Sequence, residues 1–220
     1  MNKLTRHLAE PGITDVLVFI IFIILLVTIY FFVKDFLKKR GEFRRRIDMM
    51  AKIDELTHLY KRNFFHTLFE SELERSRRYG RDLSCAIIEI DNFNEIKDKY
   101  GTKFCDLVVQ DIGEIFTDDT RIHDICARYG EYSFASLMPE SDMDAAMIVC
   151  KRLRGLIEGC KFVMDGVNES IHITVSVGLA SCNDSLQEEE INPDKMMEMA
   201  YEALNSAQEK GGNTVVCFSV

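Results

Sequence analysis

Residues 171–180, which read IHITVSVGLA, constrain the fold more than any other stretch of this chain. Apolar side chains occupy every second position, at Ile171, Ile173, Val175, Val177 and Leu179. Strict alternation is the pattern of a half-buried β-strand. Because a single strand leaves its backbone hydrogen bonds unsatisfied, the chain must supply further strands and a layer that covers them.

Three other stretches have the features of strands. LSCAIIEID at 83–91 is an apolar run of strand length, and TVVCF at 214–218 is a shorter one. Residues 124–138 alternate on both sides of a corner at Gly130-Glu131, which predicts a β-hairpin.

Helical patterns separate these strands. Apolar residues recur at intervals of three and four in 63–79 and 104–116. Ser141 is the expected N-cap of a third helix, and Asn192-Pro193 is the expected start of a fourth. This alternation predicts an α/β fold in which helices flank a mixed sheet of five strands.

Composition agrees with a packed domain. Of the 220 residues, 47% are hydrophobic, which is enough for a core. The seven cysteines form no Cys-x-x-Cys pair and mostly lie in apolar runs, so we expect buried, reduced thiols.

The run VLVFIIFIILLVTIYFFV at 16–33 contains no charged residue. As a helix it would extend about 27 Å, close to the ~30 Å thickness of bilayer hydrocarbon. A cleaved signal peptide is the alternative, but the run is too long and no small-residue cleavage site follows it. The sequence therefore predicts a retained transmembrane helix in contact with lipid, preceded by a short extracytoplasmic tail at 1–15.

Flanking charges predict the orientation of this helix. Two basic residues precede it, whereas seven follow it in a predicted basic helical stalk at 34–53: Lys34, Lys38, Lys39, Arg40, Arg44, Arg45 and Arg46. The positive-inside rule then places the chain in the inner (cytoplasmic) membrane as a single-pass protein with its soluble domain in the cytoplasm.

The remaining charge is acidic. Residues 1–50 carry nine Lys or Arg and five Asp or Glu, so residues 51–220 account for −13 within the overall −9. Such a domain is not expected to bind nucleic acid non-specifically, and an anionic ligand would need local arginines.

Five motifs follow one another in a specific order: DELTHLYKR (54–62), IEIDNFNEIKDKYG (88–101), RIHDICARYGEYSF (121–134), ITVSVGLA (173–180) and ALNSAQEKGGN (203–213). Together they resemble the GGDEF domain of diguanylate cyclases, which condense two GTP molecules into cyclic di-GMP. The resemblance defines residues 54–220 as a GGDEF domain. It implies a five-stranded sheet, an active site at the hairpin, magnesium as cofactor and function as a dimer.

The signature itself departs from the family. It reads Gly130, Glu131, Tyr132, Ser133 and Phe134, so a carboxylate replaces the second glycine and neither acidic position is acidic. The resemblance implies that Tyr132 replaces a metal-binding carboxylate, whereas Asp91 matches the other one. Glu131, one position early, is the remaining alternative ligand. We therefore expect a degenerate domain that is not an enzyme, with no cofactor and no metal site beyond the Asp91 remnant; magnesium would be needed only for residual activity.

Most of the family's nucleotide-binding groups are also replaced. Lys97 stands at the position of a guanine-reading Asn, Asn94 at that of a phosphate-binding Lys, and Gln208 and Gly212 at those of a late Lys and Arg. The acidic residues that remain form a remnant nucleotide site: Asp91, Asp98 and Asp106.

A second ligand motif is intact. Arg121 and Asp124 match the family's RxxD site, which binds cyclic di-GMP away from the active site. Arginine can bind phosphate in bidentate fashion, and a carboxylate can accept from guanine N–H groups. A further arginine is expected from the next helix, and the sequence leaves Arg152 and Arg154 open. A surface ion pair without a ligand is the alternative interpretation of Arg121 and Asp124.

These observations favour a receptor or effector for cyclic di-GMP that lacks catalysis. Two alternatives remain: a scaffolding protein that pairs with other signalling proteins, and a cyclase with residual activity. The sequence specifies neither the protein partner nor whether two copies pair, and it leaves GTP binding open.

Overall fold

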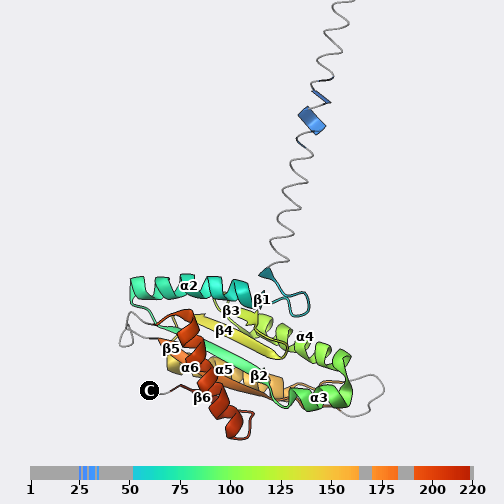
Figure 1. Cartoon of the computed structure of the whole chain (residues 1–220), viewed down its shortest axis with the longest axis vertical. Coiled ribbons are helices and arrows are strands. Elements are labelled where there is room, and N and C mark those ends of the chain that lie inside the picture. The colour runs from blue at the N-terminus through green and yellow to red at the C-terminus, as the bar shows by residue number, and fades with distance from the viewer. Residues whose placement is uncertain are drawn as a thin grey trace, which may run out of the picture. The chain divides into compact units, whose positions relative to one another are not determined.

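The computed structural model describes residues 25, 27, 28, 30–32, 34, 52–163, 170–182 and 191–218. The chain divides into two units, Met1–Met49 and Met50–Val220, and the second unit holds the sheet (Figure 1). The predicted tail at 1–15 and most of residues 16–53 lie outside the described residues.

The second unit alternates strands and helices as predicted. In chain order these are β1 (Tyr60–Lys61), α2 (Arg62–Tyr79), β2 (Leu83–Ile90), α3 (Phe93–Tyr100), α4 (Thr102–Asp119), β3 (Ile125–Arg128), β4 (Ser133–Pro139), α5 (Met143–Gly159), β5 (Val175–Cys182), α6 (Pro193–Glu209) and β6 (Val215–Cys217).

The sheet is mixed, with strand order β1-β3-β4-β2-β5-β6. Strand β2 pairs antiparallel with both β4 and β5, whereas the edge strands β1 and β6 pair parallel with their neighbours. The sheet has six strands, so the prediction of five is wrong by one. The additional strand, β1, is two residues long and is too short to produce a periodic pattern.

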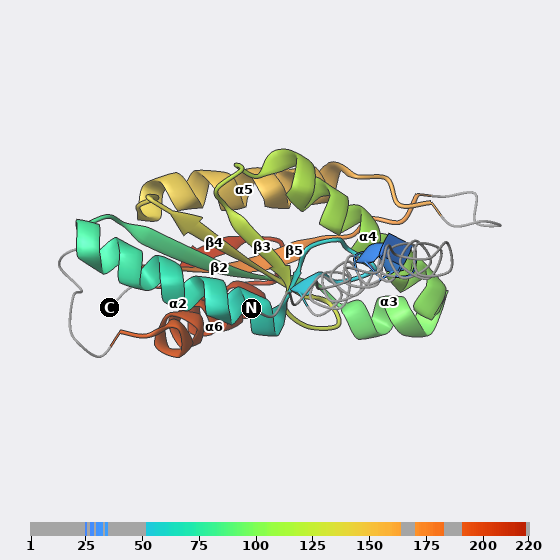
Figure 2. The ribbon, with the colours of Figure 1, turned by 90° about the horizontal axis from the view of Figure 1, so that it is seen from above.

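Helices cover both faces of the sheet (Figure 2). Alternate residues of β2 explain the two layers: Cys85 and Ile87 pack with side chains of α2 and α6, whereas Ile88 and Ile90 pack with those of α4 and α5. This arrangement confirms an α/β fold with helices on both sides of a mixed sheet.

Two helix starts follow from capping. The side chain of Asn192 accepts a hydrogen bond from the backbone N–H of Lys195 at 2.8 Å, as the sequence predicts for the start of α6. The predicted cap of α5 is corrected by one residue, because Asp142 accepts from the N–H of Ala145 at 2.8 Å. Ser141 is instead buried, and its carbonyl oxygen accepts a hydrogen bond from Ser84.

Gly178 fixes the spacing between β5 and α6. A Cβ atom at this position would lie 2.0 Å from the carbonyl oxygen of Ala200 and 2.3 Å from the backbone nitrogen of Leu204. Both are backbone atoms, so the helix itself would have to move away from the sheet.

We therefore expect Gly178→Ala to lower the free energy of unfolding by about 3 kcal/mol, the upper range for overpacking a core. The matched control is Gly155→Ala in α5, where a Cβ atom meets nothing within 4 Å. That variant should be stabilised by about 0.5–1 kcal/mol, because alanine favours a helix. Urea unfolding measures both free energies. If Gly178→Ala were as stable as the unmodified chain, the close contact between β5 and α6 would be contradicted.

The predicted single-pass placement in the inner membrane needs correction. A membrane-crossing helix requires about 20 consecutive apolar residues. Among the residues that the structure describes, no helix is long and apolar enough to cross a bilayer.

Candidate functional site

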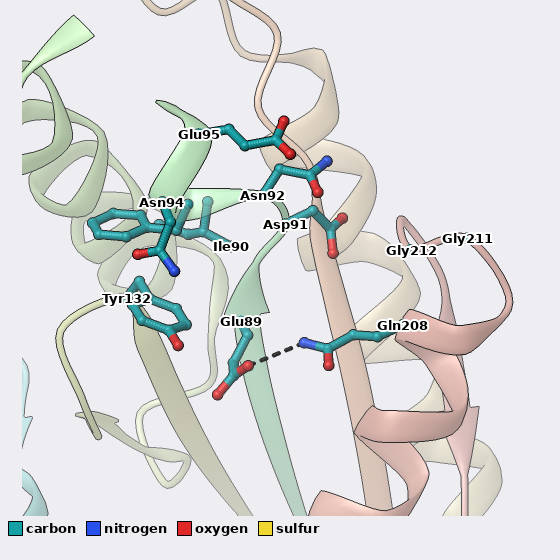
Figure 3. A pocket seen from close by; sticks show the side chains of 11 residues that line it. Glu89, Ile90, Asp91, Asn92, Asn94, Glu95, Tyr132, Gln208, Gly211 and Gly212 are labelled. Atoms are coloured by element: carbon teal, nitrogen blue, oxygen red, sulfur yellow. Dashed lines mark hydrogen bonds between the residues drawn. The ribbon is translucent and has the colours of Figure 1, made fainter. Parts of the chain in front are cut away.

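A cavity of about 580 Å³ opens where β2 ends and the chain enters α3 (Figure 3). Its walls come from three regions that are distant in sequence: residues 89–95, Tyr132 of the hairpin turn, and Gln208, Gly211 and Gly212 at the end of α6. This is the position of the predicted remnant active site.

Asp91 lines this cavity, but its carboxylate is engaged by the protein. One oxygen, Oδ1, accepts from the hydroxyl of Ser176 at 2.6 Å. The other, Oδ2, accepts from the hydroxyl of Thr174 at 2.7 Å and from the backbone N–H of Asn213 at 2.9 Å. Asp91 therefore ties the end of β2 to β5 and to the turn before β6.

Glu89 is the carboxylate that faces the cavity from β2. Its Oε2 accepts one hydrogen bond from the side-chain amide of Gln208, at 3.0 Å (Figure 3). Burial raises the pKa of Glu89, the nearby charge of Asp91 raises it further, and the Gln208 hydrogen bond partly offsets both. The sequence-based choice of site residues did not include Glu89.

The signature turn holds no carboxylate in the cavity. Tyr129 and Gly130 donate backbone hydrogen bonds to the carbonyl oxygen of Ser133 at 2.8 and 3.0 Å, which confirms the predicted hairpin. The carboxylate of Glu131, the alternative metal ligand, forms an ion pair with Lys97. The turn is thus closed by its own backbone hydrogen bonds, and its one carboxylate is paired with α3.

Aromatic stacking fixes the remaining signature residues. Tyr132 stacks on Phe93 with ring centroids 4.9 Å apart and an interplanar angle of 22°. Phe134 is fully buried and stacks on Phe116. Tyr132 and Phe93 therefore form an aromatic wall where a carboxylate is expected from the family pattern.

The signature turn contributes no carboxylate to this cavity, and Asp91 is largely occupied by protein hydrogen bonds, whereas Glu89 accepts a single one. Mg²⁺ requires carboxylate oxygens that are free to coordinate. The oxygens of Asp91 already accept three hydrogen bonds, and Tyr132 supplies a phenol. In the part of the chain that the structure describes, no group of three or more His, Cys, Asp or Glu is placed to hold a metal ion.

The other predicted remnants lie apart from the cavity. Asp98 on α3 and Asp106 on α4 are both exposed, and neither is among the lining residues of this cavity. The sequence pattern therefore marks three acidic positions, of which the structure places only Asp91 at the cavity.

A second cavity, of about 380 Å³, contains the Arg121–Asp124 turn. It is lined by seven residues: Glu72, Arg75, Arg121, His123, Asp124, Pro139 and Glu140. Pro139 pairs with Leu83 at the start of β2, whereas the first cavity begins at Glu89. At about 3.3 Å per residue, the two cavities therefore lie at opposite ends of β2, about 20 Å apart.

The Arg121–Asp124 turn is closed by its own hydrogen bonds. The backbone N–H of Asp124 donates to the carbonyl oxygen of Arg121 at 2.9 Å, and the N–H of Arg121 donates to Asp124 Oδ2 at 3.0 Å. Burial raises the pKa of Asp124, while the Arg121 backbone hydrogen bond and the charges of Arg121 and Arg152 oppose the rise.

The two candidate arginines of α5 have different neighbours. Arg152 donates to the carbonyl oxygen of Asp119 at the end of α4, and its charge acts on Asp124. Arg154 binds Glu158 at 2.8 Å and the side chain of Asn213 at 2.6 Å. Arg152 is thus the arginine beside the Arg121–Asp124 turn.

Sequence reasoning named only Arg121 and Asp124 among the seven residues of the second cavity, and the missed residues include Arg75 and Glu140. Arg75 lies in the basic stretch RSRRYGRD at 75–82, which resembles an ordinary solvated helix end. Glu140 follows β4 directly and belongs to no motif. No local signal in the sequence brings either residue to the cavity, because β2 and β4 must first pair.

Known proteins resemble this chain in sequence and in fold. A family model described as "Diguanylate cyclase, GGDEF domain" matches residues 51–214. Diguanylate cyclase A of Treponema denticola is 32% identical over 169 residues, which are 76% of this chain and 44% of that protein. The chain spans less than half the length of the curated relatives that it matches.

Two solved structures share the fold. The coiled coil and GGDEF domain of DgcB from Caulobacter crescentus, in complex with c-di-GMP, has a TM-score of 0.81 at 22% identity, over 87% of this chain and 98% of that chain. Diguanylate cyclase SiaD from Pseudomonas aeruginosa, in complex with its activator SiaC, has a TM-score of 0.71 at 22% identity, over 89% of this chain and 72% of that chain.

Proposed function

This chain belongs to the diguanylate cyclase GGDEF domain family, and from that premise we propose that it is a cyclic di-GMP receptor without cyclase activity. The ligand occupies the cavity that contains Arg121 and Asp124. Binding there alters how the chain engages a protein partner.

The distribution of cationic side chains between the two cavities carries the proposal. Two arginines, Arg75 and Arg121, line the second cavity together with three carboxylates, so its formal charge is −1. None of the eleven described residues that line the first cavity is Lys, Arg or His, and three of them are Asp or Glu. Only the second cavity therefore offers guanidinium donors to a phosphate-containing ligand, whereas the described lining of the first cavity carries three negative charges and no cationic side chain.

The same imbalance argues against turnover of GTP. Phosphoryl transfer requires cations that neutralise the charge developing on the phosphate oxygens. The first cavity offers the amides of Asn94 and Gln208 in their place, and Gln208 is bound to Glu89. A triphosphate would meet the charge of Glu89 without a compensating cation.

Isothermal calorimetry on the full chain, with cyclic di-GMP and with GTP plus Mg²⁺, tests this function. We expect saturable binding of cyclic di-GMP and no heat from GTP. Incubation with labelled GTP should yield no cyclic di-GMP. If the chain does not bind cyclic di-GMP, the proposed receptor function is wrong. If labelled cyclic di-GMP forms, the proposed lack of cyclase activity is wrong.

A protein-binding role without a nucleotide is the second candidate. It is favoured by the complex of the similar protein SiaD with its activator SiaC. In that case the Arg121→Ala variant would retain partner capture as fully as the unmodified chain does, and neither would bind cyclic di-GMP.

A further inference from the structure

The cavity around Arg121 contains more carboxylates than arginines. Glu72, Asp124 and Glu140 line it together with Arg75 and Arg121. A cyclic dinucleotide carries two phosphodiester charges, so it would enter a cavity whose arginines already face internal anions. The binding of such a ligand requires one of these carboxylates to give way.

Glu140 is the carboxylate that engages the arginines of α2 and of the turn after it. It forms an ion pair with Arg81, and its Oε1 also lies 3.6 Å from a guanidinium nitrogen of Arg75. Arg75 has one other anionic neighbour, Glu72, at 3.5 Å. One oxygen of Glu140 thus contacts two guanidinium groups, as a ligand phosphate oxygen would.

The backbone places Glu140 there at a conformational cost. Its φ angle is +56°, in the left-handed region that side chains other than glycine rarely adopt. The neighbours on both sides are held: Pro139 pairs with Leu83, and the carbonyl oxygen of Ser141 accepts a hydrogen bond from Ser84 at 2.8 Å. Such conformations persist only where the surrounding structure enforces them.

We propose that Glu140 is a built-in competitor of the ligand: in the free protein its carboxylate pairs with Arg81 and occupies the guanidinium group of Arg75, which lines the cavity, and cyclic di-GMP must displace it from Arg75. Glu140 thereby sets the affinity of the cavity for the dinucleotide. This inference rests on the proposed receptor function and adds the residue that limits it.

Displacement is feasible because the ion pair is exposed. The side chains of Arg81 and Glu140 are 50% and 49% exposed. Exposed ion pairs contribute little to stability, so a ligand phosphate that binds a guanidinium in bidentate fashion can replace the carboxylate. A single carboxylate would therefore tune binding without holding the fold together.

The test compares the affinity of the full chain for cyclic di-GMP before and after Glu140→Gln, which keeps the size of the side chain and removes its charge. Removing one negative charge near the phosphates should tighten binding by about tenfold at low salt, and the gain should shrink as salt is added. Glu140→Gly is the second variant, because glycine adopts the positive φ without strain. Both variants should gain affinity.

The matched control is Glu198→Gln. Glu198 also forms an exposed ion pair, with Lys195 at 2.8 Å, but it lies on α6 and does not line the cavity. The affinity of the Glu198→Gln variant for cyclic di-GMP should equal that of the unmodified chain. Arg75→Ala combined with Glu140→Gln should lose most of the gain.

The outcomes separate this inference from the receptor function. If the unmodified chain binds cyclic di-GMP and both Glu140 variants bind it equally or more weakly, Glu140 is not a competitor. The receptor function is unaffected by that result. If the two Glu140 variants bind cyclic di-GMP and the unmodified chain does not, Glu140 is a competitor, but the unmodified chain is not a receptor. If none of the proteins binds, both proposals fail.

Discussion

Arg121→Ala is expected to weaken the binding of cyclic di-GMP by about a hundredfold. Hydrogen bonds to charged groups contribute about 1.5–3 kcal/mol each, and loss of a bidentate pair removes two of them. A loss of about 3 kcal/mol corresponds to roughly a hundredfold change in the dissociation constant. Arg121 lines the cavity of the second site, and calorimetry on the full chain measures the change.

The fold of this variant should be intact. Arg121 is exposed, and its structural contribution is made by the backbone, which alanine retains: its N–H donates to Asp124 and its carbonyl oxygen accepts from Asp124. The matched control is Arg78→Ala, which removes the same charge from an exposed position on α2 that does not line the cavity.

Unchanged affinity in Arg121→Ala, or an equal loss in Arg78→Ala, would contradict a ligand in this cavity. An equal loss in the control would mean that a general field attracts the dinucleotide. A local site is the expected result, because the domain as a whole is acidic and cannot attract anions from a distance.

Periodicity explains which parts of the fold were predictable from sequence. The alternation of residues 171–179 located β5, although the strand begins only at Val175 and is buried on both faces, and apolar stripes located the helices. Strand β1 could not be located in this way, because two residues show no period. Pairing of β3 with β4 followed from the Gly130-Glu131 corner, which is a short-range signal.

The site residues were less predictable because their roles depend on partners far along the chain. Glu89 resembles one more position in an apolar strand until Gln208, 119 residues later, is placed beside it. Asp91 resembles a free carboxylate until Thr174 and Ser176 are folded against it. A sequence motif names residue types, but it does not show which oxygens remain free.

Asp91→Ala is expected to lower the free energy of unfolding by about 4 kcal/mol. Three donors would lose their acceptor: the hydroxyls of Thr174 and Ser176 and the backbone N–H of Asn213. Hydrogen bonds to an ionised group are the strong ones, and a donor left unsatisfied on burial adds the cost of its lost hydration. Urea unfolding with a constant m-value measures the change.

The control for this variant is Asp118→Ala, an exposed carboxylate near the end of α4, whose effect should stay within about 0.5 kcal/mol. Asp91→Asn should fall between the two, because an amide oxygen still accepts but carries no full charge. If Asp91→Ala instead kept its stability, the carboxylate would be free for a ligand, since three protein hydrogen bonds of this kind cannot be removed without cost. The stability difference therefore measures how much the three hydrogen bonds of Asp91 contribute to the fold.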